Sequence, residues 1–293
     1  FNTAQFGIAV PADSFDIVIN EILFNPVTDG YDFIELYNRS DKFIDLSSIT
    51  LAEYDLADTT LIDEFTKVSP EGRLFLPGTY IVITEDIEQT VENYFVTNTG
   101  NFIQNDQTPN YPDDEGIVVI QNAALQVIDK IHYYDNWHFA LLDDADGVSL
   151  ERVNYEFETQ DQNNWHSASE DVHYATPGYQ NSVFGNVSAG SGNINLEYEV
   201  FSPDGDAWHD LLLIHYQTAA AGYVANFTVF DAQGRSVKQL TNNMTLSVEG
   251  FITWDGVNED GMRSKTGIYI LYAELFDLNG NTEKHKLKFT LVN

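Results

Sequence analysis

The stretch Phe201-Ser-Pro-Asp-Gly-Asp-Ala-Trp-His-Asp210 places three carboxylates at offsets of zero, two and six in a turn that contains glycine. Further along the chain come Thr253-Trp-Asp-Gly256 and Thr266-Gly-Ile-Tyr-Ile270. Short apolar runs separated by polar, glycine-containing turns are typical of a small β-sandwich. These stretches therefore predict a β-sandwich module in this part of the chain, and they favour scaffolding, binding or sorting over catalysis.

The rest of the sequence also has the pattern of an all-β protein. Helical periodicity is nearly absent, and short β-branched and aromatic runs recur between clusters of Gly, Pro, Asn and Asp. The expected strands are 16–22, 32–38, 44–53, 79–84, 117–122, 126–133 and 148–153, then 194–201, 210–217, 223–231, 236–240, 250–254, 267–277 and 283–292. A short edge helix fits 87–94. We predict an all-β fold of two tandem immunoglobulin-like β-sandwich domains.

The length of 293 residues exceeds that of a usual single domain, which has about 100–200 residues. Residues 186–193 are small and flexible, which is typical of an interdomain linker. We therefore expect a leader or linker strand at 1–15, a first domain at 16–185, and a second domain at 194–293. Since residue 1 is Phe and the first residues read like a linker, we also expect a processed piece of a longer chain.

Composition limits the classes of partner. The net charge is −33, with 33 acidic against 6 basic residues in 1–189 and 13 against 7 in 190–293. Such a field repels nucleic acid and anionic membranes, and it favours cations such as Ca²⁺. A solvated acidic surface on an extracellular protein is the plainer interpretation. The chain has no cysteine, which excludes disulfides and thiolate metal sites. No apolar run approaches the roughly 20 residues of a membrane helix.

Several motifs in the first half resemble the bacterial lamin-tail domain. Its opening is similar to Ile17-Val-Ile-Asn-Glu-Ile-Leu-Phe-Asn-Pro26 and Phe33-Ile-Glu-Leu-Tyr-Asn-Arg-Ser40, and stretches 44–51 and 76–82 continue the likeness. Stretches 147–152, 164–168 and 175–182 resemble its close. Ile49 stands where that family commonly has Trp. The resemblance implies an immunoglobulin-like module that binds or packs against a partner, and such modules also accompany nuclease, phosphatase and protease domains.

The second half resembles the immunoglobulin-like domain of the flagellar hook-capping protein and of C-terminal domains in Bacteroidetes surface proteins. The likeness rests on 201–210, 229–235, 254–256, 267–269 and 284–291. The usual form of the first motif has Gly and Asn where this chain has Ala207 and His209. The resemblance implies a C-terminal sorting or anchoring module, often a cargo of the type IX secretion system, on an exported protein at the outer membrane, cell surface or outside the cell.

Two acidic turns are candidate metal sites. Asp204, Asp206 and Asp210 could converge on one Ca²⁺ ion, because carboxylate and carbonyl oxygens form its preferred shell of six to eight ligands. The alternative is a polar turn in which the Asp side chains cap backbone N–H groups without a metal. Asp143, Asp144 and Asp146 form a second, weaker candidate, and its alternative is a solvated loop tip.

Other polar and aromatic residues suggest further interpretations. Glu21 and Glu35 lie in two early strands, and a carboxylate pair is typical of glycosidases. Acidic neighbours on strands are ordinary, however, and in the lamin-tail pattern both glutamates look structural, so a structural role is favoured; Glu21 could instead form an internal ion pair with Arg39 or Arg152. Four tryptophans, Trp137, Trp165, Trp208 and Trp254, could bind carbohydrate or simply pack in the cores. The seven histidines do not follow a zinc-hydrolase spacing.

The sequence therefore predicts a non-catalytic protein, exported or on the cell surface, that serves in binding and assembly. We expect protein partners at the cell surface or in the secretion machinery, with no nucleic acid and no membrane span, and Ca²⁺ as the one candidate cofactor. Two alternatives remain open. The chain could carry the accessory modules of a secreted hydrolase whose catalytic domain lies upstream, or it could bind glycans.

Overall fold

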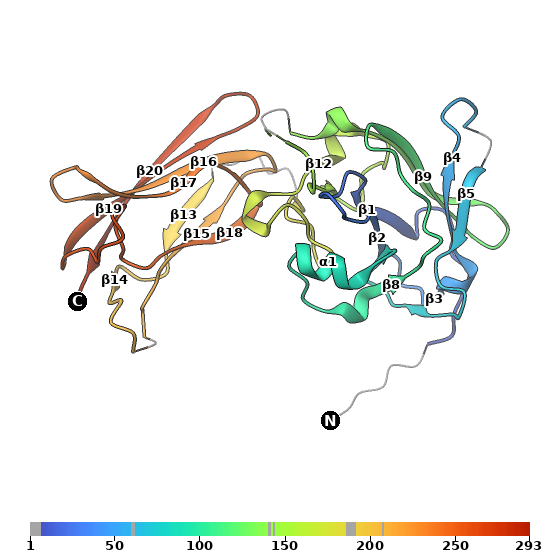
Figure 1. The fold of residues 1–293 in the computed structure, drawn as a ribbon, viewed down its shortest axis with the longest axis horizontal. Helices are drawn as coiled ribbons and strands as arrows, with labels where there is room; N and C mark the ends of the chain where they lie inside the picture. Colours follow the sequence, from blue (N-terminus) through green and yellow to red (C-terminus); the bar gives the residue numbers. More distant parts are fainter. Residues whose placement is uncertain (1–6, 60–61, 140–141, 143, 186–191, 207) are drawn as a thin grey trace. The chain divides into compact units, whose positions relative to one another are not determined.

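The computed structural model describes residues 7–59, 62–139, 142, 144–185, 192–206 and 208–293. The chain divides into two compact units, of which the first comprises Phe1–Ala168 and Val172–Phe184 and the second Ser169–Asp171 and Gly185–Asn293 (Figure 1). Each unit is an immunoglobulin-like β-sandwich with its own apolar core, which confirms the predicted fold class. In the described ranges, no helix is long and apolar enough to cross a membrane.

The first unit has two main sheets. The six-stranded sheet has the order β12 (Trp165–Ser167), β11 (Leu150–Arg152), β1 (Ile17–Leu23), β2 (Phe33–Asn38), β7 (Tyr80–Thr84) and β8 (Phe102–Gln104). The four-stranded sheet has the order β10 (Val127–Tyr134), β9 (Glu115–Gln121), β4 (Thr50–Tyr54) and β5 (Ile62–Lys67). A small pair joins β3 (Ile44–Asp45) to β6 (Leu74–Phe75). Its short helices are α1 (Ile87–Asn93), η1 (Leu46–Ser48), η2 (Thr99–Asn101), η3 (Asp135–Trp137) and η4 (Gln162–Asn164). The first two residues of η5 (Glu170–Val172) belong to the second unit.

The six-stranded sheet is covered on both faces, and β2 shows why. Successive side chains of a strand point to opposite faces. Ile34 and Leu36 therefore join the main core between the sheets, whereas Phe33 packs in a second apolar cluster on the outer face. Residues of α1, β8 and the segment after β12 help to cover that outer face. As a result, every residue of the central strand β1 is buried.

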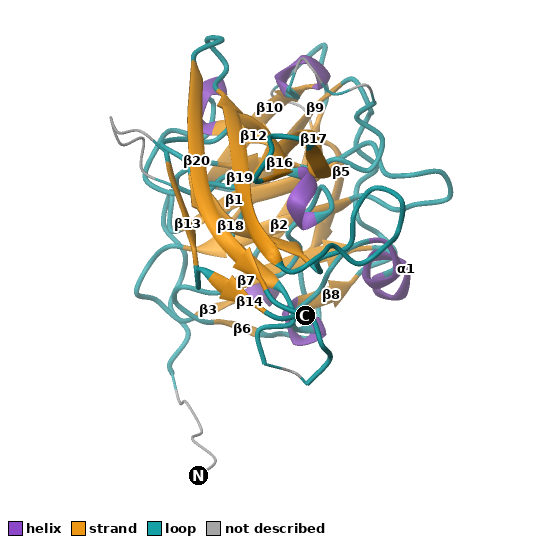
Figure 2. Cartoon of the chain, turned by 90° about the vertical axis from the view of Figure 1, so that its left-hand side faces the viewer, coloured by secondary structure: helices purple, strands orange, loops and turns teal. Residues whose placement is uncertain are grey.

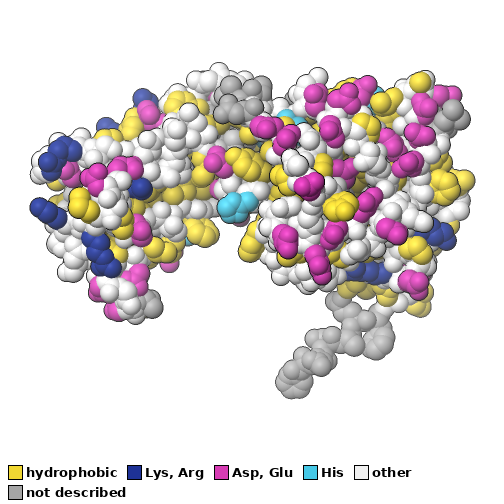
Figure 3. All heavy atoms as spheres, viewed as in Figure 1, with side chains coloured by type: hydrophobic (Ala, Val, Ile, Leu, Met, Phe, Trp, Pro, Cys, Tyr) yellow, Lys and Arg dark blue, Asp and Glu magenta, His cyan; other side chains and the backbone are white. Residues whose placement is uncertain are grey.

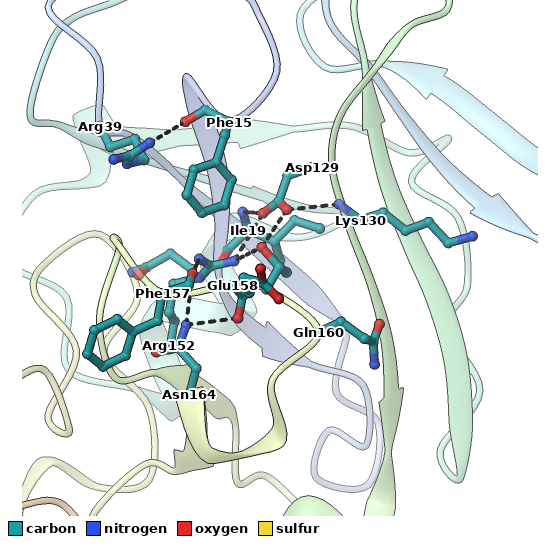
Figure 4. Close-up of polar contacts among 12 residues, drawn as sticks. Phe15, Ile19, Arg39, Asp129, Lys130, Arg152, Phe157, Glu158, Gln160 and Asn164 are labelled. Carbon is teal, nitrogen blue, oxygen red and sulfur yellow. Dashed lines mark hydrogen bonds and ion pairs between the residues drawn. The ribbon is translucent and has the colours of Figure 1, made fainter.

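A buried arginine connects the two sheets of the first unit (Figure 4). The Arg152 side chain is fully buried on β11, and its Nε donates to the carbonyl of Ile19 at 2.8 Å. Its Nη2 lies 3.1 Å from Oδ2 of Asp129, which belongs to the opposite sheet and also accepts the N–H of Ile19 at 2.9 Å. The pairing of β1 with β2 is irregular after Ile19, and that of β10 with β9 is irregular before Asp129. Such irregularities interrupt the regular hydrogen bonds between strands, so the backbone groups of Ile19 can bond to side chains instead. The ion pair therefore fixes how the sheets face each other.

The second unit pairs a three-stranded with a five-stranded sheet. The smaller sheet has the order β13 (Asn193–Leu196), β15 (Leu212–Gln217) and β18 (Glu249–Trp254). The larger has the order β14 (Val200–Phe201), β20 (Thr282–Leu291), β19 (Gly267–Phe276), β16 (Tyr223–Asp231) and β17 (Ser236–Leu246). Figure 2 shows β19 and β20 running side by side as a long hairpin.

Three expected strands differ from those observed. The run 44–53 divides into β3, η1 and β4, and 194–201 divides into β13 and β14, which belong to different sheets. The strand expected to end at 240 continues to Leu246, and Asn243 within it adopts a positive φ of 54° where the pairing with β16 is irregular. The edge strand β5 was not expected, since its mixture of acidic and apolar residues does not alternate cleanly.

The Arg152–Asp129 pair should contribute strongly to stability. Burial lowers the pKa of Arg152 to about 10, and it raises the pKa of Asp129 although Arg152 lies beside it. Asp129→Asn leaves a buried guanidinium without its counter-charge, so we expect a loss of about 3–5 kcal/mol in the free energy of unfolding. Urea unfolding followed by circular dichroism measures this loss.

The matched control is Glu156→Gln, which removes the partner of Arg39 in an ion pair whose carboxylate is well exposed. Exposed pairs contribute about 0–1 kcal/mol, so this variant should unfold close to wild type. Equal effects of the two substitutions would contradict a structural role for the buried pair.

Candidate functional site

The acidic turn of the second unit brings the three predicted carboxylates together. Ligand oxygens of Asp204, Asp206 and Asp210 all lie within 4.8 Å of one another, and the side chains are exposed or half-buried. The positive φ of Gly205, 86°, lets the chain fold back so that its N–H donates to Oδ1 of Asp210 at 2.6 Å. The backbone therefore positions one carboxylate opposite the other two.

The same carboxylates also cap the turn. Asp204 Oδ1 accepts the N–H of Asp206 at 3.1 Å, and Asp206 Oδ1 accepts the N–H of Trp208 at 2.8 Å. Because an ionised carboxylate has two oxygens with about four acceptor positions, these bonds leave capacity for a cation. Calcium binds oxygens at about 2.3–2.6 Å, so ligands on opposite sides of one ion are roughly 5 Å apart. The observed spacing fits Ca²⁺.

The second acidic turn has a different arrangement. Asp143 lies outside the described residues. Asp144 Oδ1 accepts the N–H of Asp146 at 3.1 Å, and Asp146 Oδ1 accepts from the side-chain amide of Asn25 at 2.9 Å. Within the part of the chain that the structure describes, the group at 204, 206 and 210 is the set of three potential ligands that converges.

A larger set of carboxylates lies inside the first unit. Glu21 is the register partner of Glu35 on β2 and of Glu151 on β11, so the three form a row across adjoining strands. All three residues are completely buried. They lie on the same outer face of the six-stranded sheet that carries the second apolar cluster.

These glutamates bind the chain segment that closes the unit, residues 174–184, named here the closing segment. Glu21 accepts the N–H of Thr176 at 2.8 Å, and Glu35 accepts the N–H of Gly178 at 2.6 Å. Glu151 accepts from the Thr176 hydroxyl at 2.7 Å and from the N–H of Val183 at 3.1 Å. The segment has no regular strand, so these bonds satisfy backbone donors that a sheet would otherwise pair.

Burial makes these carboxylates weak acids. Desolvation, followed by the nearby charge of Glu151, raises the pKa of Glu21 to about 8. Desolvation raises the pKa of Glu151 to about 7, and desolvation together with Glu21 raises that of Glu35 well above its ordinary value. Protonation of part of the row therefore lets three adjacent carboxylates share one buried site.

This geometry resolves the alternatives for the early glutamates. Because Glu21 and Glu35 are fully buried and bonded to the closing segment, they offer no exposed oxygen to a substrate, and the catalytic interpretation is wrong for this pair. The expected ion pair of Glu21 with Arg39 or Arg152 is also wrong. Arg39 pairs with Glu156 and Arg152 with Asp129, while Glu21 is bonded to Ser149 and Thr176.

The aromatic candidates separate by exposure. Trp165 and Trp254 are only 4% and 2% exposed and belong to the two cores. Trp208 is 71% exposed, and its ring stacks at 4.7 Å on His209, which in turn stacks at 3.9 Å on Tyr198. This three-ring stack beside the acidic turn was not predicted, because it depends on how the turn folds the ring of His209 back onto Tyr198.

Part of the first unit matches a known protein family. Residues 11–135 match the model of the Lamin Tail Domain family, which confirms the predicted lamin-tail domain. The closing motifs at 147–152, 164–168 and 175–182 lie beyond the match but within the same structural unit. No curated protein matches the chain.

Solved structures give weaker similarities. The structure of FlgD from P. aeruginosa is 17% identical, with 28% of this chain and 62% of that chain covered and a TM-score of 0.24. Dimeric latent PorU from Porphyromonas gingivalis is 10% identical, with coverages of 97% and 20% and a TM-score of 0.28. PorZ, an essential surface component of the type IX secretion system of the same organism, is 11% identical, with coverages of 93% and 38% and a TM-score of 0.26. This chain thus spans less than two thirds of each of these structures.

The acidic turn leads to a direct test of calcium binding. If the three carboxylates hold the ion, millimolar Ca²⁺ should stabilise the second unit, by roughly 3 kcal/mol at a hundred times Kd. Asp204→Asn, Asp206→Asn and Asp210→Asn combined should abolish that stabilisation. Calorimetric titration and thermal unfolding with and without Ca²⁺ measure both effects.

A matched control removes three exposed acidic charges elsewhere in the same unit, by Glu199→Gln, Glu249→Gln and Asp260→Asn. This variant should respond to Ca²⁺ like wild type. If Ca²⁺ leaves the wild-type melting temperature unchanged, or stabilises the two triple variants equally, the turn is a metal-free cap.

The buried glutamates predict a distinctive pH dependence. A carboxyl whose folded-state pKa is raised stabilises the fold fully below its unfolded pKa of about 4.5, and loses that effect as pH rises through the folded value, here about 7 to 8. The closing segment should therefore open more easily at pH 8.5 than at pH 5. Hydrogen-exchange protection of the Thr176, Gly178 and Val183 amides measures its opening free energy.

Glu21→Gln imitates the protonated acid and should reduce this pH dependence between pH 5 and 8.5, by about 1.4 kcal/mol for each unit by which burial raises the pKa of Glu21. Burial also raises the pKa values of Asp32 and Glu53 to about 7, so global stability shares the same trend. Glu53→Gln should leave the closing segment's profile unchanged, and an identical response to both substitutions would refute the assignment.

Proposed function

We propose that this chain, whose first unit contains a lamin tail domain, is a non-catalytic protein of the cell surface or exterior that serves in binding and assembly. The first unit binds or packs against a partner protein. The second unit directs export or surface attachment, as do the C-terminal modules of type IX secretion cargo that its sequence resembles. Its acidic turn binds Ca²⁺ as a structural ion.

The observation that supports the second unit's role most is the convergence of its motifs. Phe201, Trp254 and Tyr269 come from three separate motifs, and Trp254 lies 5.5 Å from Phe201 and 5.6 Å from Tyr269 between ring centroids. The indole N–H of Trp254 donates to the carbonyl of Val257 at 2.9 Å. The motif residues thus form one core cluster beside the acidic turn, as expected if the motifs build one structural module.

Gly256 explains why the Trp-Asp-Gly motif needs glycine. Its φ is 80°, and a Cβ there would lie 2.9 Å from Cγ of Pro203 in the neighbouring motif. A side chain at this position would push two motifs apart. The close approach links the acidic turn's geometry to the core of the module.

The buried polar groups of the first unit support a binding role. Its row of completely buried carboxylates, Glu21, Glu35 and Glu151, is bonded to the closing segment and stabilises the fold. Its solvent-facing surface carries scattered acidic side chains (Figure 3). An acidic surface on a rigid scaffold suits steered recognition of a cationic or polar partner protein.

The proposed export role can be tested by truncation in the native host. Deleting residues 194–293 should keep the remaining protein from the cell surface and medium, because the sorting module is lost. Fractionation and immunoblotting locate the product. The reciprocal control fuses residues 192–293 to a reporter protein, which should then be exported. Normal secretion of the truncated chain would show that the second unit does not direct export.

A further inference from the structure

Strand β20 forms a long, regular margin of the five-stranded sheet. It pairs with β19 over ten consecutive register partners without a shift. On its other side β14 pairs only at Thr290 and Leu291. From 284 to 288, no strand of the described residues pairs with that side.

The backbone groups on this open side belong to identifiable residues. The N–H of Thr290 donates to the carbonyl of Glu199 at 2.8 Å, and the N–H of Val292 donates to that of Phe201 at 3.0 Å, both on the β14 side. Backbone N–H and C=O groups alternate in direction along a strand. Residues 284, 286 and 288 share the parity of 290, so their N–H and C=O groups also point away from β19.

The same three positions are lysines. Lys284, Lys286 and Lys288 are exposed, while the residues between them are half-buried. Lys284 pairs with Glu274 at 3.0 Å, and the Lys286 ammonium lies 5.6 Å from the ring centroid of Tyr272, so both stems stand on the outer face. The chain's net charge is −33, yet Lys and Arg side chains gather on the second unit in Figure 3.

The opposite edge of the sheet is protected differently. Strand β17 has three register shifts against β16, and Asn243 on it has a φ of 54°. Such bulges twist an edge and prevent another strand from adding to it. Between 284 and 288, β20 has neither bulge nor proline, and its own barrier to strand addition is the lysine row. Lysines repel basic strands and disfavour apolar ones, but they attract acidic ones.

We infer that the edge of β20 from Lys284 to Lys288 is a docking site for an extended acidic segment of another protein. That segment adds as a further strand, with Asp or Glu at every second position. Its backbone pairs with the open groups of 284, 286 and 288, and its carboxylates lie directly opposite the lysines at about 4.5–5.5 Å between Cβ atoms. The site is independent of the proposed export role and of the acidic turn.

A peptide-binding experiment on the full chain tests this inference. The probe is a fluorescent ten-residue peptide of alternating Glu and Thr, compared with a Lys/Thr peptide and with a Glu/Pro peptide that cannot form a strand. Fluorescence anisotropy should show binding of the Glu/Thr peptide alone. Lys284→Gln, Lys286→Gln and Lys288→Gln combined should weaken it about tenfold or more, in line with three lost cross-strand charge pairs.

The matched control is Lys238→Gln, Arg263→Gln and Lys265→Gln, which removes the same charge from other positions in the second unit and should bind the Glu/Thr peptide like wild type. Equal binding of the Glu/Pro peptide, or equal weakening by both triple variants, would reduce the effect to general electrostatics and overturn the inference. The inference would also be overturned if the wild-type protein bound no peptide while the β20 variant self-associated. The lysines would then act only to prevent edge-to-edge association of this chain.

Discussion

Three buried glutamates hold the first unit closed. Taking carboxylates out of water is costly unless each is hydrogen-bonded or protonated. Glu21, Glu35 and Glu151 meet this requirement by accepting bonds from the closing segment, which in turn lacks any sheet partner of its own. The sheet and the segment therefore satisfy each other, and neither would be stable as observed without the other.

The same central strand also carries the link between the sheets. Ile19 and Glu21 flank the irregularity of β1. The side chain of Glu21 belongs to the glutamate row, whereas the backbone N–H and carbonyl of Ile19 bond to Asp129 and Arg152. Both polar networks thus depend on one local distortion. Because a fully satisfied polar network has a single best geometry, these bonds specify a unique arrangement that apolar packing alone would leave less defined.

The sequence predicts those features whose cause is local. Alternation located most strands, and the spacing of Asp204, Asp206 and Asp210 predicted their convergence, because a tight glycine turn determines it. The partners of Glu21 and Arg152 could not be predicted. Thr176 lies 155 residues from Glu21, and nothing near Arg152 distinguishes Asp129 from other acids. The exposed stack of Trp208 was also missed, because it depends on how the acidic turn folds and not on a pattern of apolar residues.

The two units treat their open sheet surfaces in different ways. In the first, the closing segment and the second apolar cluster cover the outer face of the larger sheet. The carboxylates buried there accept hydrogen bonds from the closing segment, which offset the cost of removing them from water. In the second, β19 and β20 keep an exposed outer face, with Ile268 at 59% exposure and the lysine row beside it. A covered face serves stability, whereas an uncovered face with ordered charge can contact other molecules. The capacity for strand-mediated recognition therefore follows from what the second unit leaves unpaired.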